Sequence, residues 1–196
     1  MSLPTDALFD SHLPQALQDL SENHWTPVAI AKRAARLATT GHYRKGEECR
    51  VLDVGSGVGK FCIAGALTTT AHFVGVEQRE SLVIVAREIA QTLAVPRVEF
   101  VVGNLEAVDW RDFNAIYMFN PFSENLDEAA RIDETCPIKW ELYMKYVDQT
   151  DALLSRLAKG TRVVTLNGYG GRFPDRYLQI HHEVAGGLSL ELWRKE

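Results

Sequence analysis

The residues with the clearest chemical potential form a short glycine-rich turn after an apolar run. Residues 51–54 are a β-type run, and glycines follow at alternate positions, at Gly55, Gly57 and Gly59. A turn without side chains lets the backbone approach a ligand closely, and the N-terminus of a following helix favours an electron-rich group. This spacing predicts a cofactor-binding turn between a strand and a helix.

Two kinds of cofactor use such a turn. A dinucleotide turn has the pattern G-x-G-x-x-G, in which the third glycine allows close packing of the helix on the strand. That position is Lys60 when counted from Gly55 and Cys62 when counted from Gly57, so the third glycine is missing. The pattern that does occur is D-x-G-x-G-x-G, with Asp53 before the first glycine.

The D-x-G-x-G-x-G pattern resembles the first motif of the seven-strand (class I) S-adenosylmethionine-dependent methyltransferases. In that family the acid binds the amino-acid end of the cofactor, directly or through water, and the glycines make room for its methionine part. The resemblance implies that S-adenosyl-L-methionine is bound by the turn residues Asp53, Gly55, Ser56, Gly57 and Gly59.

A second acid follows the next apolar run. Residues 72–76 lead to Glu77, about 20 residues after the first glycine of the turn. A carboxylate at that point can accept hydrogen bonds from both hydroxyls of a ribose. NAD sites carry an acid at the same place, so Glu77 and the adjacent Gln78 predict a nucleoside cofactor of either kind. A nucleotide-cofactor oxidoreductase is therefore one alternative.

The middle of the chain alternates apolar runs with helical stripes, which predicts a parallel sheet with helices on both faces. A hairpin with Gly186-Gly187 as its turn is predicted at the C-terminal end. The class I methyltransferase sheet ends in this way, so we expect a doubly wound, mostly parallel seven-stranded sheet of the Rossmann-like methyltransferase type. The expected strands are 50–54, 73–77, 98–102, 115–119, 162–166, 177–184 and 188–193, and a helix is expected over 137–158.

The domain organisation expected from the sequence is a single domain with an N-terminal cap. Residues 1–48 read as a helical lid, and residues 49–196 as the S-adenosylmethionine-binding part. Thr26 is a candidate helix cap, with Pro27 at the first helical position. Trp25 is interpreted either as an aromatic residue that closes over the cofactor or as a side chain that packs against the sheet edge.

Ligands of open α/β sheets lie beyond the carboxyl ends of the strands, where the two remaining candidate segments also fall. Asn104 and Leu105 follow the third expected strand. The methyltransferase family often has an acid at the position of Asn104, and that acid accepts a hydrogen bond from the adenine amino group of the cofactor. An asparagine can still accept through its carbonyl oxygen, and the Leu105 amide can meet a ring nitrogen.

The segment Asn120-Pro121-Phe122 follows the fourth expected strand and is the candidate catalytic site. It resembles the (N/D)-P-P-(Y/F) signature of methyltransferases that act on amino nitrogens, with one proline absent. It also resembles the N-N-F form of the non-SET histone lysine methyltransferases, whose G-S-G-V-G and G-V-E segments match residues 55–59 and 75–77. An Asn-Pro turn after a buried strand is the structural alternative.

The expected reaction is methyl transfer to a nitrogen. The Asn120 amide oxygen can orient an amino group, and Phe122 can stack on a flat or cationic acceptor. Acids in the following connection would attract a cationic acceptor if they form a rim, although a solvated loop explains them equally well: Glu124, Asp127, Glu128, Asp133 and Glu134. Trp140, Tyr143 and Tyr146 recur at helical spacing and are interpreted as core. A non-catalytic binding protein of the same fold is the other alternative.

The composition fits this interpretation. The chain has 196 residues with a net charge of −5, which favours a protein or small-molecule acceptor over nucleic acid. No apolar run is long enough to cross a membrane, so no membrane partner is expected, and residues 1–10 do not resemble a signal peptide. The sparse cysteines Cys49, Cys62 and Cys136 favour a reduced, cytoplasmic protein, and no metal site is expected.

Overall fold

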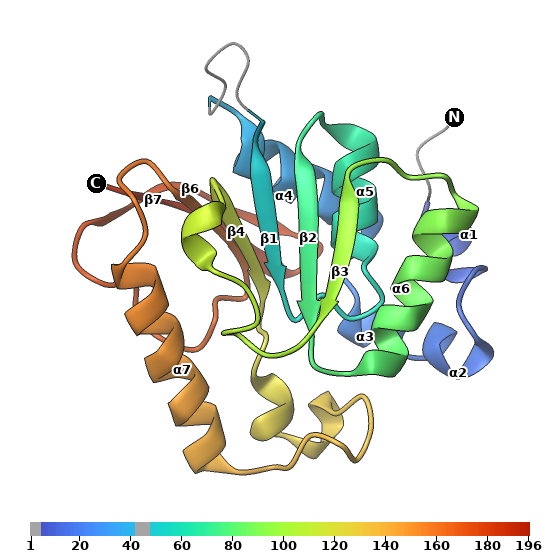
Figure 1. Cartoon of the computed structure of the whole chain (residues 1–196). Coiled ribbons are helices and arrows are strands. Elements are labelled where there is room, and N and C mark those ends of the chain that lie inside the picture. Colours follow the sequence, from blue (N-terminus) through green and yellow to red (C-terminus); the bar gives the residue numbers. More distant parts are fainter. Residues whose placement is uncertain (1–4, 42–47) are drawn as a thin grey trace.

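The computed structural model describes residues 5–41 and 48–196. Its centre is one sheet with the strand order β3-β2-β1-β4-β5-β7-β6 (Figure 1). The first five of these strands are parallel, and β7 runs antiparallel between β5 and β6. This confirms the predicted fold class. The strands are Arg50–Val54 (β1), His72–Glu77 (β2), Val98–Val102 (β3), Ala115–Phe119 (β4), Arg162–Leu166 (β5), Tyr177–Ala185 (β6) and Leu188–Lys195 (β7).

The central parallel strands are short apolar runs because both of their faces are covered. In β1 only Arg50 is partly exposed, and in β4 only Phe119 is. The predicted hairpin forms with Gly186 at φ 60° and Gly187 at φ 82°. Both angles lie in the left-handed region that a two-residue hairpin turn of this type requires, which explains why glycine occupies both positions.

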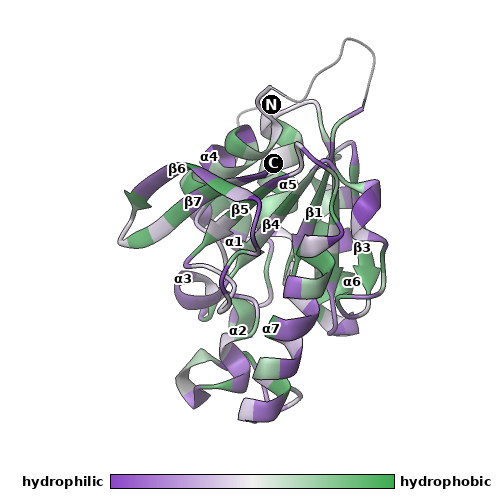
Figure 2. Cartoon of the chain, turned by 90° about the vertical axis from the view of Figure 1, so that its left-hand side faces the viewer, coloured by the Kyte–Doolittle hydropathy of each residue, from purple (hydrophilic) through white to green (hydrophobic). Residues whose placement is uncertain are grey.

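Helices cover both faces of the sheet and enclose two separate cores (Figure 1). The core under α4, α5 and α6 includes Phe61 and Phe73, and the core under α7 includes Trp110 and Leu154. Figure 2 shows the alternation of hydrophilic and apolar residues along α7 that this one-sided burial requires. These four helices are Val28–Thr39 (α4), Lys60–Thr68 (α5), Glu80–Thr92 (α6) and Trp140–Ser155 (α7).

Shorter helical segments occupy the two connections that matter for the site. Three lie before α4, and two single turns lie in the connection between β4 and α7 (Figure 1). A further turn precedes β4. Their bounds are Asp6–Asp10 (α1), Gln15–Gln18 (α2), Ser21–His24 (α3), Trp110–Asp112 (η1), Ser123–Asn125 (η2) and Glu128–Ala130 (η3).

The predicted start of α4 is wrong. Pro27 is the N-cap residue, and the first backbone amide, that of Val28, donates to Asp6 Oδ1 at 2.9 Å. The Thr26 hydroxyl instead lies 2.8 Å from the Tyr117 hydroxyl inside the core. A carboxylate from a distant helix therefore caps α4, and local sequence signals do not record such a partner.

The helix expected over 137–158 is also shorter than predicted. Its first residues are tied to η2, because the amide of Lys139 donates to the Asn125 carbonyl at 2.9 Å and Asn125 Nδ2 donates to the Pro137 carbonyl at 2.9 Å. The helix α7 therefore begins at Trp140. Across residues 5–41 and 48–196, none of the helices combines the length and the apolar character that crossing a membrane requires.

Candidate functional site

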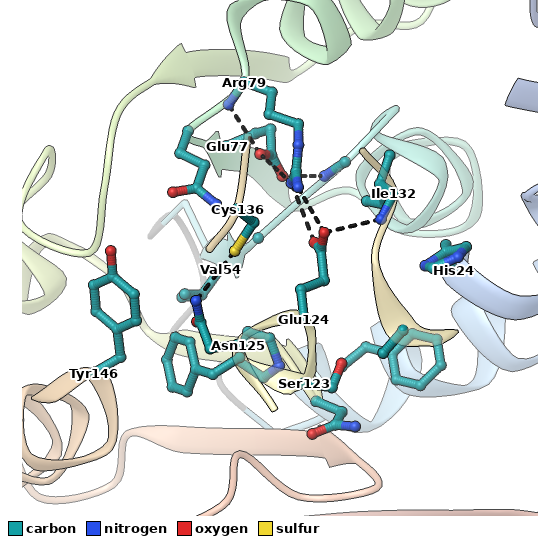
Figure 3. A pocket seen from close by; sticks show the side chains of 18 of the residues that line it. His24, Val54, Glu77, Arg79, Ser123, Glu124, Asn125, Ile132, Cys136 and Tyr146 are labelled. Carbon is teal, nitrogen blue, oxygen red and sulfur yellow. Dashed lines mark hydrogen bonds and ion pairs between the residues drawn. The ribbon is translucent and has the colours of Figure 1, made fainter. Parts of the chain in front are cut away.

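A cavity opens at the carboxyl ends of β1, β2, β3 and β4, as the parallel topology predicts. It encloses about 930 Å³ when the open solvent at its mouth is included. Candidate residues from four strand ends meet there, and Figure 3 shows the side chains around it. Those that line it are Gly55, Gly57, Glu77, Gln78, Asn104, Leu105, Asn120, Pro121 and Phe122.

The glycine turn contributes the backbone of Gly55 and Gly57 to the cavity lining. The amides of Gly55 and Ser56 both donate to the Val76 carbonyl, at 2.9 and 3.0 Å, and the amide of Gly57 donates to Glu77. These donors are therefore already used within the protein. At Gly57 φ is 53°, and an added Cβ would lie 2.5 Å from the ring of Trp25. Only glycine fits this turn beneath the tryptophan.

Glu77 lies at the carboxyl end of β2 and is the buried acid of the cavity, with 4% of its surface exposed. Its Oε2 accepts from the Gly57 amide at 3.1 Å, and its Oε1 accepts from the Arg79 amide at 3.0 Å. Burial raises the pKa of this carboxyl, and the two amide hydrogen bonds act against that effect. A carboxylate has about four acceptor positions, so each oxygen can still accept from a ligand hydroxyl.

Asp53 lies behind the glycine turn and does not line the cavity. Its side chain is buried, Oδ2 accepts from the Cys62 thiol at 3.4 Å, and burial raises the pKa of the carboxyl to about 7. Ser56 and Gly59 are also outside the lining. Within the described residues Ser56 Oγ has no hydrogen-bond partner, and it packs against Gly75, where an added Cβ would lie 2.6 Å from it.

Asn104 and Leu105 are adjacent in the cavity wall beyond β3. The Asn104 side-chain oxygen accepts from the Leu105 amide at 2.8 Å, so the two groups expected to contact the adenine are bonded to each other in this structure. Asn104 Nδ2 donates to the Tyr146 hydroxyl at 3.4 Å. Tyr146 comes from α7, packs against the core and also lines the cavity. Trp140 at the start of α7 is 60% exposed, so the prediction that it belongs to the core is wrong.

The segment Asn120-Pro121-Phe122 turns sharply at the end of β4 and faces the glycine turn. Asn120 has a φ of 38°, a left-handed conformation that asparagine tolerates better than most residues, and its amide donates to the Gly168 carbonyl at 3.2 Å. An added Cβ on Gly55 would lie 3.5 Å from Pro121 Cβ. Phe122 stacks on Tyr146 with 5.5 Å between the ring centroids.

The N-terminal segment supplies a wall of the cavity. Asn23, His24 and Trp25 line it, and burial lowers the pKa of His24. The Trp25 indole covers Gly57, and its Nε1 donates to the Leu17 carbonyl at 3.3 Å. Trp25 lies over Gly57 and is also a buried member of the core under α4, α5 and α6, so this position agrees with both interpretations of Trp25.

The wall formed by the connection between β4 and α7 contains an ion-pair cluster around the buried Arg79, which sequence reasoning missed. Arg79 pairs with Glu124 and Asp133, so two of the acids expected to form a rim are used in ion pairs within the protein. Figure 3 shows the pair with Glu124. The exposed acids of the connection are Asp127, Glu128 and Glu134. In the part of the chain that the structure describes, no three His, Cys, Asp or Glu side chains are arranged to hold a metal ion.

Comparisons with known proteins agree with this geometry. Similar solved structures include an RNA methyltransferase from Salinibacter ruber in complex with S-adenosyl-L-homocysteine, at 24% identity over 87% of this chain and 92% of that chain, with a TM-score of 0.62. TrmN from Thermus thermophilus is 21% identical over 87% of this chain and 49% of that chain, with a TM-score of 0.60. A methyltransferase from Geobacter sulfurreducens is 16% identical over 96% and 95%, with a TM-score of 0.58.

These similarities show a shared fold, and a family model adds evidence from the sequence itself. No curated protein sequence matches the chain. The family model described as "Methyltransferase domain" matches residues 45–155, which is more than half of the chain and includes most of the cavity wall. The chain therefore belongs to the methyltransferase domain family.

Proposed function

We propose that this protein transfers a methyl group from S-adenosyl-L-methionine to a nitrogen atom of a protein or small-molecule acceptor. The observation that carries the proposal is the meeting, in one cavity, of the Glu77 carboxylate, the glycine turn and the Asn120–Phe122 segment. When bound, S-adenosylmethionine would supply a methyl group activated by its sulfonium. The residues of the chain would bind the cofactor, orient the acceptor and exclude water.

The proposed cofactor residues fit an adenosine. Glu77 retains acceptor positions for the ribose hydroxyls, and Gln78 lies beside it in the wall. Asn104 and Leu105 are proposed to flank the adenine, and the methionine part is proposed to lie against the backbone of Gly55 and Gly57, which line the cavity. Because Asp53 lies behind the turn, we propose that its contact with the amino-acid end passes through water.

The acceptor is proposed to lie between Asn120 and the rings of Phe122 and Tyr146. The Asn120 side-chain oxygen can accept an amino hydrogen and thereby aim the nitrogen lone pair, while the stacked rings favour a flat or cationic group. The resemblance of residues 55–59, 75–77 and 120–122 to the histone lysine methyltransferases supports an amino nitrogen. The net charge of −5 supports an acceptor that is not a polyanion, and the cysteine usage supports the cytoplasm.

RNA is the rival acceptor class, because the Salinibacter ruber protein is described as an RNA methyltransferase. A screen that transfers a tritiated methyl group to cell lysate fractions separates the classes: protease-sensitive label supports a protein acceptor, nuclease-sensitive label supports RNA, and label in the low-molecular-weight fraction supports a metabolite. The variant Asn120→Ala tests the acceptor site directly. We expect it to abolish transfer while S-adenosylhomocysteine affinity stays within a few fold, and unchanged turnover would overturn the acceptor site.

Titration calorimetry separates the remaining alternatives. We expect heat for S-adenosylhomocysteine and none for NADH. The reverse result would support an oxidoreductase. Binding of S-adenosylhomocysteine without label in any lysate fraction would support a non-catalytic protein of this fold.

A further inference from the structure

Arg79 is a buried cation held by two acids of the connection between β4 and α7. Its side chain is 5% exposed. Nη1 and Nη2 donate to the two carboxylate oxygens of Glu124 at 3.1 and 2.6 Å (Figure 3). Nε donates to Asp133 Oδ2 at 3.0 Å. The fork of the guanidinium is therefore satisfied by two residues of the connection between β4 and α7.

Glu77 lies next to this guanidinium but makes no hydrogen bond to it. The separation between Arg79 Nη1 and Glu77 Oε1 is 3.7 Å, an ion pair but longer than a hydrogen bond. Both Glu77 oxygens accept instead from backbone amides. The acids across the cavity thus hold the guanidinium away from the carboxylate that we propose for the ribose.

Glu124 and Asp133 also organise the wall to which they belong. Glu124 Oε2 accepts from the Ile132 amide at 3.0 Å, and Asp133 Oδ1 accepts from the Thr135 amide at 2.9 Å. Ser123, Asn125, Ile132 and Cys136 of this wall line the cavity next to Phe122. The Arg79 cluster therefore joins the end of β2, where the cofactor is proposed to bind, to the wall on the acceptor side.

We propose that Glu124 is a positioning residue for the cofactor: by holding the Arg79 guanidinium, it keeps the Glu77 carboxylate available to the ribose hydroxyls. The inference rests on the proposed function, because it assumes that Glu77 receives those hydroxyls. Without Glu124, the nearest alternative acceptor for the freed end of the guanidinium is Glu77, and a bidentate arginine pair would occupy the oxygens that the ribose needs.

The test compares two ligands. One is S-adenosylhomocysteine, and the other is its 2′,3′-dideoxy analogue, which lacks the ribose hydroxyls. In the unmodified protein the first should bind more tightly than the second. In Glu124→Gln we expect S-adenosylhomocysteine to bind about tenfold more weakly while the analogue changes little, so the ratio of the two affinities falls. Glu128→Gln is the matched control, because Glu128 lies in the same wall with an exposed side chain.

The outcomes separate this inference from the proposed function. If the unmodified protein does not bind S-adenosylhomocysteine, the proposed function fails. If it binds and Glu124→Gln leaves the ratio unchanged, either because nothing moves or because both ligands weaken equally, Glu124 is structural and the inference is overturned. If Glu124→Gln does not fold, Asp133→Asn removes the other acceptor of the same guanidinium, and we expect a smaller fall in the same ratio. An unchanged ratio there overturns the inference equally.

Discussion

Among single residues, Gly57 is one whose backbone conformation should affect both stability and ligand binding. We expect Gly57→Ala to weaken S-adenosylhomocysteine binding more than about tenfold and to lower the free energy of unfolding by about 1–3 kcal/mol, because φ is 53° and the methyl group would meet Trp25. Calorimetry and urea unfolding measure the two effects. Gly187→Ala is the control, since φ is 82° with open space around it. It should lose stability without losing affinity, and equal affinity loss would contradict the steric argument.

Asp53 gives a pH dependence whose sign can be worked out. Its pKa in the folded protein is about 7, above the ordinary value of 3.8, so the folded state binds the proton more tightly than the unfolded state. This group therefore makes the free energy of unfolding fall as pH rises from about 4 to 7, by about 4 kcal/mol in total.

Asp53→Asn tests that expectation. The difference in the free energy of unfolding between this variant and the unmodified protein should shift in favour of the variant as pH rises through that interval, and should level off above it. Urea unfolding at several pH values measures the difference. A difference that stays constant with pH would show that the carboxyl titrates normally.

The sequence predicted the candidate residues that occupy strand ends, and it could not predict which partners they find. Glu77 and Asn120 follow apolar runs, and parallel topology brings such ends together. The pairing of Arg79 with Glu124 depends on how residues 123–136 fold back over the cavity, which no local pattern encodes. The same limit explains why the acids of this connection were interpreted as an exposed rim.

Lys60 is the link between elements on the N-terminal side. Its side chain is 3% exposed and pairs with Asp6 at 2.8 Å and Asp10 at 2.9 Å, and it donates to Ser21 Oγ at 3.0 Å. These contacts tie α1 and α3 to the first turn of α5, directly after the glycine turn. The wall that contains Trp25 is therefore anchored to the helix whose start forms the cofactor turn.

We expect Lys60→Met to increase local opening of this wall more than it destabilises the rest of the protein. Removing the cation leaves two carboxylates close together and should lower the free energy of unfolding by about 1–3 kcal/mol. Hydrogen exchange should become faster in α1–α3 and stay unchanged in β4 and β5. Lys159→Met, at an exposed lysine, should change neither. Uniform acceleration along the chain would argue against a local anchor.

Strands and helices differ in how well the sequence predicted them. The five parallel strands were predicted almost to the residue, because each is a short, largely apolar run. The start of α4 was wrong because Asp6 supplies its cap from another helix, and α7 begins at Trp140 because Asn125 binds the residues before it. Long-range side-chain partners thus decide the ends of elements whose existence local patterns predict.

At the scale of the whole molecule, ligand binding should raise thermal stability. At a concentration of S-adenosylhomocysteine about 100 times its dissociation constant, the folded state gains about 2.7 kcal/mol. For a chain of this size that corresponds to a rise in Tm of roughly 5–10 °C, which differential scanning fluorimetry detects. NADH at the same concentration is the control and should leave Tm unchanged. A shift with NADH alone would favour the oxidoreductase alternative.

The wall formed by Asn23, His24 and Trp25 has a consequence for how the protein can be divided. The region that the family model matches begins at residue 45, after this wall and after α4, whose Ala31, Ala34 and Ala38 are fully buried. The stretch that matches the family model therefore lacks the part of the cavity lining that Asn23, His24 and Trp25 supply. A truncated protein starting at residue 45 would keep the region that matches the family model. Its cavity would lack one wall, and the apolar surface that α4 buries would be exposed to solvent.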